Sequence, residues 1–224
     1  MDRYTIVFDL DGTLVETAPD LVRATNHVLA LKGLPPVPHD AIRPHISFGA
    51  RAMITEGLRL HGAALDSAET DDLHARFLAF YGENIAVGSH VFPGLETALD
   101  ALAAAGARLA VCTNKQERPS RQLLDALGLT RRFQAIAGRD TFAVFKPHPG
   151  HLTGAIERAG GTPGRAIMVG DSDTDVQTAR AAGIPVIGVP FGYTDVPMAD
   201  LAPDALVSHY DELVETVKRL VHSD

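Results

Sequence analysis

Two carboxylates, Asp9 and Asp11, stand at the end of the apolar run 6–8 and just before Gly12 and Thr13. Acidic side chains placed together where a buried strand stops repel each other and lose hydration, so a purely structural role explains them poorly. A bound cation would relieve both costs. Gly12 allows a sharp backbone turn, and Thr13 offers a hydroxyl and an amide to an anion. The simpler alternative is a strand that ends in an Asp- and Gly-rich turn.

Three further polar clusters favour chemistry over a simple turn, and two of them also follow apolar, strand-like runs. Residues 113–115 (Thr-Asn-Lys) follow the run 109–112, and residues 170–175, which hold three aspartates, follow the run 166–169. The third cluster, Lys-Pro-His-Pro at 146–149, comes after a weak strand and a loop. In open parallel sheets, ligands bind beyond the carboxyl ends of the strands, where the strand order reverses. All four clusters converge there if the first strand lies between the other two.

The combined residues suit phosphoryl transfer from a phosphate monoester. A carboxylate can attack phosphorus and form an acyl-phosphate, which divides one difficult hydrolysis into two easier steps. We predict that Asp9 is the nucleophile and that Asp11 first protonates the leaving alkoxide and later deprotonates the attacking water. Lys146 is expected to neutralise the nucleophile and the phosphoryl oxygens, to which Thr113 and the amides after it donate hydrogen bonds.

The acidic residues also predict a metal site made only of oxygen atoms. Asp171, Asp9 and the carbonyl of Asp11 form a donor set that suits Mg²⁺, a hard cation that keeps several waters. Asp175 lies one helical turn beyond Asp171, so both can face the same side, and Asp175 is expected to bind the metal or to support it. Helix capping is the simpler alternative for both Asp173 and Asp175, because acidic residues are favoured in a first turn, and we expect it of Asp173.

The predicted phosphate-binding set is Gly12, Thr13, Thr113, Asn114 and Lys115, with Arg51 as a further candidate. Simpler roles stay open for several of these residues. Lys146 would be a solvated loop lysine if the acidic clusters were absent. Asn114 can cap a turn, Lys115 can be surface charge, and Arg51 can lie on a solvated face.

Three histidines have both a functional and a simpler interpretation. His148 and His151 have the spacing of part of a zinc site, but no cysteine or third histidine lies near them in the sequence. We therefore expect ordinary loop histidines at both positions. His45 is a candidate for contacting a substrate, with a solvated surface as the alternative.

The composition describes an ordinary globular protein and limits its partners. The 224 residues are 46% hydrophobic and 21% charged, enough to bury a sizeable core. A net charge of −8 without a Lys/Arg-rich run argues against nucleic acid or an anionic membrane as partner. The single cysteine, Cys112, fits a reducing compartment, and neither a signal peptide nor a membrane-spanning stretch is evident. We expect a cytoplasmic monomer or homodimer that acts on a small phosphorylated metabolite.

From residue 95 onward, helical and strand-like patterns alternate, which predicts an α/β fold. Strands this apolar, interleaved with helices, indicate a parallel sheet that is covered by helices on both faces. Strands are expected at 109–112, 135–137, 166–169, 186–189 and 205–207, and helices at 95–105, 119–127, 150–159, 173–182 and 210–221.

The segment 15–87 breaks this alternation and carries no strand signal. Four residues, Leu73, Phe77, Phe80 and Tyr81, fall on one helical face. The proline-rich stretch 35–38 separates a first helix from the rest. A βαβ crossover needs only about 30 residues, and the helix after residue 95 already supplies one. We therefore predict that 1–14 and 88–224 form the core domain, and that 15–87 is an inserted helical lid over the Asp-rich turn.

These motifs resemble those of the haloacid dehalogenase superfamily of aspartate-dependent phosphatases, in the same order along the whole chain. Residues 9–13 look like its first motif, Thr113 and Asn114 its second, Lys146 its third, and residues 170–175 its fourth. The resemblance implies a Rossmann-like core with an α-helical cap domain between the first two motifs, and Mg²⁺ as cofactor. It also supports the roles predicted for the two carboxylates of the first motif.

Within the superfamily the chain is most similar to phosphoglycolate phosphatases. The similarity lies in residues 113–115 and 146–149 and in a late Gly-Val and Gly-Tyr at 188–189 and 192–193. It implies 2-phosphoglycolate as the substrate. The cap departs from the family's pattern, because Ser47 and Phe48 stand where that family usually has the first two residues of a Gly-x-Gly substrate loop. This change is expected to influence which leaving group fits.

Several other activities share part of this pattern. A phosphomutase similar to β-phosphoglucomutase, a pyrophosphatase or a nucleotidase of the same superfamily would share the motifs. The dehalogenase branch does not need Mg²⁺, so Asp11 and the acidic cluster argue against it. A receiver-like phosphoacceptor module carries its acceptor after the third strand, where this chain has 138–140 (Gly-Arg-Asp), and has no large helical insertion. No P-loop or Gly-x-Gly-x-x-Gly nucleotide fingerprint is present.

Overall fold

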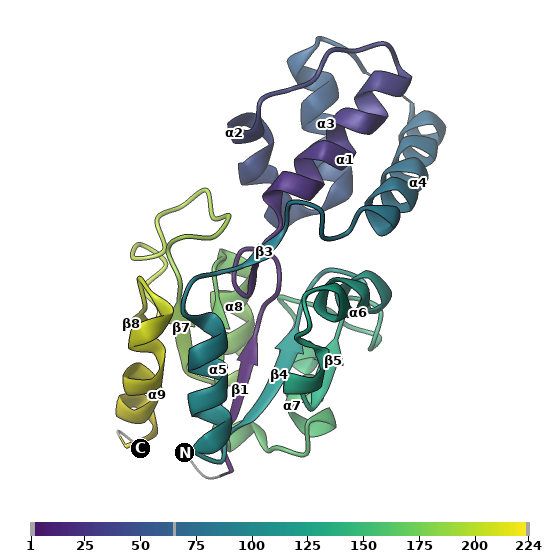
Figure 1. The fold of residues 1–224 in the computed structure, drawn as a ribbon. Helices are drawn as coiled ribbons and strands as arrows, with labels where there is room; N and C mark the ends of the chain where they lie inside the picture. The colour runs from purple at the N-terminus through teal and green to yellow at the C-terminus, as the bar shows by residue number, and fades with distance from the viewer. Residues whose placement is uncertain (1–2, 65, 223–224) are drawn as a thin grey trace. The chain divides into compact units, whose positions relative to one another are not determined.

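The inserted segment folds as a unit of its own. The computed structural model describes residues 3–64 and 66–222 and divides into two compact units, one of Met1–Glu16 with Val91–Asp224 and the other of Thr17–His90 (Figure 1). The sequence predicted the changes of domain after residues 14 and 87. The structure places them slightly later, because the short strand β2 (Val15–Glu16) belongs to the first unit.

A six-stranded parallel sheet forms the centre of the first unit, with the strand order β5-β4-β1-β6-β7-β8. Its strands are β1 (Thr5–Phe8), β4 (Arg108–Cys112), β5 (Ala135–Ala137), β6 (Ala166–Gly170), β7 (Val186–Gly188) and β8 (Ala205–Leu206). Strand β1 lies between β4 and β6, as the convergence of the polar clusters requires. The strand order therefore reverses at β1, and this is where an open α/β sheet binds its ligands.

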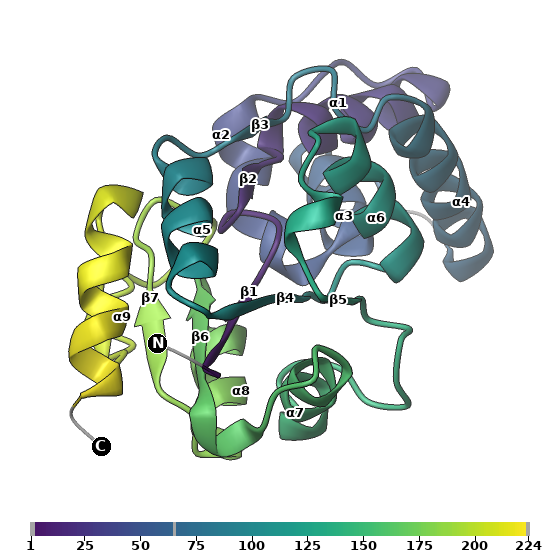
Figure 2. The same ribbon diagram turned by 60° about the horizontal axis from the view of Figure 1, so that its bottom comes forward.

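Helices cover both faces of this sheet (Figure 1 and Figure 2). They are α5 (Leu95–Ala104), α6 (Glu117–Ala126), α7 (Pro149–Arg158), α8 (Asp173–Ala182) and α9 (Leu213–Val221). On one face, Val7, Ala110 and Met168 of neighbouring strands pack in one core cluster with Leu152 and Ile156 of α7. Helix α5 packs with α9, and α7 packs with α8. The arrangement confirms the predicted Rossmann-like α/β core.

The observed helix boundaries differ from the expected ones by a few residues. Helix α6 begins two residues earlier than predicted, because the Glu117 amide donates to Asp140 Oδ1 at 2.7 Å. The last predicted helix begins as a 3-10 turn. The short 3-10 helices of this unit are η2 (Thr130–Arg132), η3 (Pro163–Arg165) and η4 (Tyr210–Glu212).

The second unit is a helical bundle. Its elements are α1 (Ala18–Leu31), α2 (His39–Ile42), η1 (Arg43–Phe48), α3 (Ala50–Leu60) and α4 (Ser67–Glu83). On the predicted face of α4, Leu73, Phe77 and Tyr81 are buried, whereas Phe80 is only half-buried. Gly57 permits close packing of α3, since a Cβ there would lie 2.8 Å from Leu29 Cδ1.

The prediction that 15–87 contains no strand is wrong at its first two residues. Strand β2 pairs with β3 (His90–Val91) in a separate two-stranded sheet where the chain passes between the units. A strand of two residues is too short to show the alternation by which strands are recognised in a sequence.

Buried Asp20 holds together the entry and exit segments of the helical unit. Its carboxylate accepts hydrogen bonds from the amides of Gly88 and Ser89, at 3.0 and 2.9 Å, and from Ser89 Oγ at 2.7 Å. Arg23 pairs with the same carboxylate at 3.1 Å. The buried charge is thus fully compensated.

Among the described helices, none is long and apolar enough to cross a membrane.

Candidate active site

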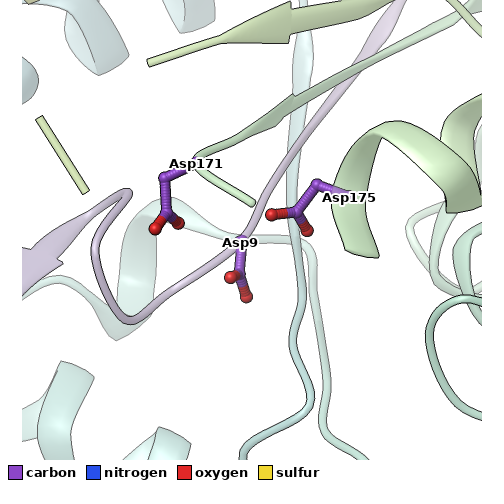
Figure 3. A group of neighbouring side chains, drawn as sticks. All are labelled: Asp9, Asp171 and Asp175. Atoms are coloured by element: carbon purple, nitrogen blue, oxygen red, sulfur yellow. The ribbon is translucent and has the colours of Figure 1, made fainter. Parts of the chain in front are cut away.

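Three aspartates from distant parts of the sequence meet at the carboxyl ends of β1 and β6 (Figure 3). Asp9 follows β1, Asp171 follows β6, and Asp175 lies in the first turn of α8. Strands β1 and β6 are parallel neighbours, with Phe8 opposite Val169, so the residues after them emerge side by side. One carboxylate oxygen from each aspartate lies within 4.8 Å of the other two.

The Lys146 ammonium lies between two of these carboxylates. Its Nζ is 3.0 Å from Asp9 Oδ1 and 2.6 Å from Asp175 Oδ1. The side chains of Lys146 and Asp175 are only 1% and 0% exposed. The alternative of a solvated loop lysine is therefore wrong. The cluster contains this one ammonium and three buried carboxylates, so it carries more negative than positive charge when all three are ionised.

This excess of negative charge appears in the pKa values. Burial raises the pKa of Asp9 to about 6, and it outweighs the opposing effect of Lys146. The pKa of Asp171 is raised well above its usual value by burial and by its carboxylate neighbours Asp9 and Asp175. Burial opposes the charged form of Lys146, but the carboxylates of Asp175 and Asp9 prevail and raise its pKa. The ammonium stays charged, and the three carboxylates share this single counter-charge.

Two loops hold Asp171 in place. Its Oδ1 accepts from Thr13 Oγ1 and its Oδ2 from the Tyr193 amide, each at 2.7 Å. Glycine is required where the loops approach it, because a Cβ on Gly12 or Gly192 would lie 2.5 or 2.2 Å from Asp171 atoms. Gly12 also has a φ of 84°, which favours glycine and confirms the predicted sharp turn.

Asp175 is fixed by the start of its own helix. Its Oδ2 accepts from the Ser172 amide at 3.1 Å and from Ser172 Oγ at 2.7 Å. Ser172 is the N-cap of α8 and forms a capping box with Asp175, so the capping alternative holds for Asp175. Asp173 lies in the same first turn but is not part of the capping box. A Cβ on Gly170 would lie 2.4 Å from Asp175 Cβ, so this glycine permits the close packing.

Asp11 has a partner of its own outside the three-carboxylate cluster. Lys115 Nζ lies 3.1 Å from both carboxylate oxygens of Asp11. The Lys115 side chain is only 9% exposed, so the alternative of a surface charge is wrong. The pair brings a second positive charge to the turn that follows β1.

The predicted phosphate-binding side chains contact protein groups in this structure. The Thr13 hydroxyl donates to Asp171, and Asn114 Nδ2 donates to the Lys146 carbonyl at 2.9 Å. Asn114 therefore helps to hold the backbone of the site lysine, a role that the alternative of a simple turn cap does not include. Thr113 is buried, and its hydroxyl accepts from the Lys115 amide at 3.3 Å. Phosphate contacts by these residues and by Gly12 stay predictions.

Two predicted candidates lie in the helical unit. Arg51 pairs with Asp71 at 2.5 Å, and His45 Nε2 lies 3.9 Å from Glu56 Oε1. Their contact with a substrate stays a prediction.

Three residues support the site in ways that were not predicted from the sequence, although Tyr193 belongs to the Gly-Tyr pair that carries part of the family resemblance. The Tyr193 hydroxyl donates to Glu16 Oε1 at 2.5 Å, and the buried Tyr210 hydroxyl donates to the Thr13 carbonyl at 2.6 Å. Both tyrosines hold the turn after β1 from segments near the end of the chain, and no local pattern marks such partners. His151 is buried in α7, so the prediction of a loop histidine is wrong.

Comparison with known proteins now identifies the family. The model of the family described as haloacid dehalogenase-like hydrolase matches residues 6–189. The chain belongs to this family. The haloacid dehalogenase-like match includes all four polar clusters of the sequence and the helical unit between the first two, so the predicted superfamily is confirmed.

Relatives of this haloacid dehalogenase-like chain are phosphatases. The chain is 50% identical over 224 residues to a phosphoglycolate phosphatase of Mesorhizobium japonicum, covering 100% of this chain and 99% of that protein. It is 49% identical over 207 residues to a phosphoglycolate phosphatase of Agrobacterium fabrum, covering 92% and 89%. A crystal structure described as a predicted phosphoglycolate phosphatase of Haemophilus somnus 129pt has a TM-score of 0.89 and 30% identity, covering 96% and 99%. The chain is a phosphatase.

The residues present fit a divalent cation. Three carboxylates converge within 4.8 Å, and the described contacts supply them with one ammonium. A set of oxygen donors with excess negative charge suits Mg²⁺ better than a softer metal. Asp9, Asp171 and Asp175 are the residues that could hold such an ion.

Proposed function

We propose that this phosphatase is an Mg²⁺-dependent phosphomonoester hydrolase that forms an aspartyl-phosphate on Asp9. The observation that carries the proposal is the position of Asp9, at the carboxyl end of a central strand, beside Asp171 and Asp175 and 3.0 Å from the Lys146 ammonium. A buried carboxylate beside a fixed positive charge can approach a phosphate without solvent competing for either group.

The chain's own residues supply the steps of the reaction. An Asp9 carboxylate oxygen forms the new bond to phosphorus as the bond to the leaving oxygen breaks, and Asp11 protonates that oxygen. Asp11 then takes a proton from the water that attacks the phosphoryl group and releases Asp9. Lys146 offsets negative charge on Asp9 and on the phosphoryl oxygens throughout.

Asp9, Asp171 and Asp175 would hold the Mg²⁺ ion in this scheme. The bound ion would reduce the repulsion between the attacking carboxylate and the phosphate dianion. Thr13, Tyr193 and Ser172 keep the two aspartates beyond β6 in position for this role.

For the substrate we propose 2-phosphoglycolate. Support comes from the names of the relatives that are about half identical over nearly the whole chain. The helical unit, as an inserted cap, would select the leaving group. Gly49 has a φ of 88° at the start of α3, so the retained glycine has a conformational reason, and Phe48 before it is 65% exposed.

The test combines turnover with trapping of the intermediate. We expect release of phosphate from 2-phosphoglycolate and from p-nitrophenyl phosphate with Mg²⁺ and not after chelation. Mass spectrometry of rapidly quenched enzyme is expected to place the phosphoryl group on Asp9. A phosphoryl group on another residue would refute the mechanism, and rapid turnover of other phosphomonoesters with none of 2-phosphoglycolate would refute the substrate. A cytoplasmic location and a monomeric or homodimeric state stay predictions from the sequence.

A further inference from the structure

A buried histidine contacts the loop that carries Lys146. His151 lies in the first turn of α7 and is fully buried. Its Nδ1 lies 3.2 Å from the backbone nitrogen of Lys146, and its Nε2 lies 3.0 Å from the carbonyl oxygen of Gly138. Both polar atoms of the ring therefore meet backbone groups, one at each end of the loop 138–146.

The two contacts determine which ring nitrogen carries the proton. The amide of Lys146 can only donate, so Nδ1 must be unprotonated to accept from it. The carbonyl of Gly138 can only accept, so Nε2 must carry the hydrogen. Burial and the nearby charge of Lys146 lower the pKa of His151 to about 4 and outweigh the Gly138 carbonyl, which raises it. The lowered pKa keeps the ring neutral at neutral pH. Phe142 packs edge-on against the His151 ring, with 6.0 Å between the two ring centroids.

Two side chains hold the backbone of Lys146, one at its amide and one at its carbonyl. His151 accepts from the Lys146 amide, and Asn114 Nδ2 donates to the Lys146 carbonyl at 2.9 Å. The loop 138–146 contains no helix or strand, so these side chains replace the support that regular structure would give. At the far end of the side chain, the ammonium reaches Asp9 and Asp175. A displaced backbone would move this ammonium away from one or both carboxylates.

We propose that His151 is a positioning residue for Lys146, acting as a neutral imidazole that binds both ends of the loop 138–146. The proposal rests on the proposed function, in which Lys146 offsets charge during phosphoryl transfer. His151 does not contact the carboxylate cluster, so its effect on the reaction passes through the lysine.

Two amide substitutions separate the two ring contacts. In His151→Asn, the side-chain oxygen can take the place of Nδ1 and accept from the Lys146 amide. In His151→Gln, the longer side chain can reach the Gly138 carbonyl but leaves the Lys146 amide without its acceptor. We expect kcat to fall about 10- to 100-fold in His151→Gln with little change in KM, and to stay close to the wild-type value in His151→Asn.

His148→Asn is the matched control. His148 is the N-cap of the same helix, and its Nδ1 accepts from the Gly150 amide at 3.0 Å, a role that asparagine also fills. We expect its kcat and melting temperature to match those of the wild type. Equal kcat values in the folded His151→Asn and His151→Gln variants would overturn the proposal, because a merely structural ring does not distinguish its two nitrogens.

A spectroscopic measurement on the wild-type protein tests the same proposal without catalysis or folding of a variant. Two-bond ¹⁵N–¹H correlations of the His151 ring are expected to show a protonated Nε2 and an unprotonated Nδ1 at neutral pH. The opposite tautomer or an imidazolium would overturn the proposal. If the enzyme hydrolyses no phosphomonoester, the proposed function fails, and the tautomer still decides whether His151 can hold Lys146.

Discussion

Charged residues serve opposite purposes at the end of the central sheet and on the helical unit. At the end of the sheet, Lys146, Asp9 and Asp175 are almost entirely buried, and carboxylates outnumber the ammonium. On the helical unit, ion pairs such as Arg51–Asp71 lie at the surface, with side chains 55% and 61% exposed, and positive and negative partners are matched.

Physical chemistry assigns different costs to these arrangements. Exposed pairs gain little and cost little, because water solvates both members. Buried charges lose their hydration, and a cluster with unequal charges is retained at the expense of stability. Perturbed, partly uncompensated groups of this kind concentrate at functional sites. The comparison therefore separates the buried cluster, for which we propose a chemical role, from exposed ion pairs such as Arg51–Asp71.

Replacing Asp9, the proposed nucleophile, should give the largest effect. We expect Asp9→Asn to lower kcat by about 10,000-fold or more, because an amide cannot attack phosphorus. Its melting temperature without Mg²⁺ should rise, since the substitution removes one of the uncompensated buried carboxylates. Steady-state phosphate release and thermal unfolding in chelator measure the two effects. A melting temperature below that of the wild type would show that the cluster is not overcharged.

Removing the ammonium should harm activity and stability together. We expect Lys146→Met to cost about 3–5 kcal/mol in the free energy of unfolding without Mg²⁺, because Asp9 and Asp175 lose their buried partner. The control is Lys32→Met on the helical unit, which breaks a pair with Glu69 at 2.9 Å between partly exposed side chains. Chemical denaturation measures both variants. Equal losses would mean that burial does not distinguish the two regions.

Metal binding should raise the free energy of unfolding as well as support activity. We expect Mg²⁺ to stabilise the wild type, by about 2.7 kcal/mol at 100 times its dissociation constant. Asp171→Asn should lose most of this gain. Asp173→Asn should keep it, because Asp173 is exposed and lies beside the cluster in sequence only. Unfolding curves over a range of Mg²⁺ concentrations measure the effect, and an unchanged response of Asp171→Asn would contradict the proposed donor set.

The contrast between the two regions also explains what could be predicted from the sequence. Apolar strands that end in aspartates predicted the sheet and the meeting of Asp9 with Asp171, and the break in the alternation of helices and strands predicted the helical insertion. These features depend on local patterns and on one rule of parallel topology. The supports of the site were missed or misassigned. Tyr193, Tyr210 and His151 act through hydrogen bonds that span distant segments, and such bonds have no periodicity.

Errors within the site have the same origin. The alternatives took Asn114 as a turn cap and Lys115 as surface charge, while the structure directs their side chains to the Lys146 backbone and to Asp11. Residue types predicted that chemistry occurs here. Only the folded chain shows which polar atoms hold other residues in place.

The smallest effects are expected on the surface of the helical unit, and they decide the role of Arg51. Arg76→Ala breaks an exposed pair with Asp72 at 2.8 Å, and it should change the free energy of unfolding by less than about 1 kcal/mol without altering kcat or KM. Arg51→Ala and Asp71→Ala break one and the same pair, so their effects on stability should be equally small.

Arg51→Ala and Asp71→Ala are expected to differ in KM only if Arg51 also binds substrate. In that case Arg51→Ala should raise KM for 2-phosphoglycolate about tenfold, through loss of a charged hydrogen bond, while Asp71→Ala should not. Steady-state kinetics of the two variants against Arg76→Ala measure this difference. Matching KM values in all three would assign Arg51 to the solvated surface, and the contrast between the two regions would then be complete.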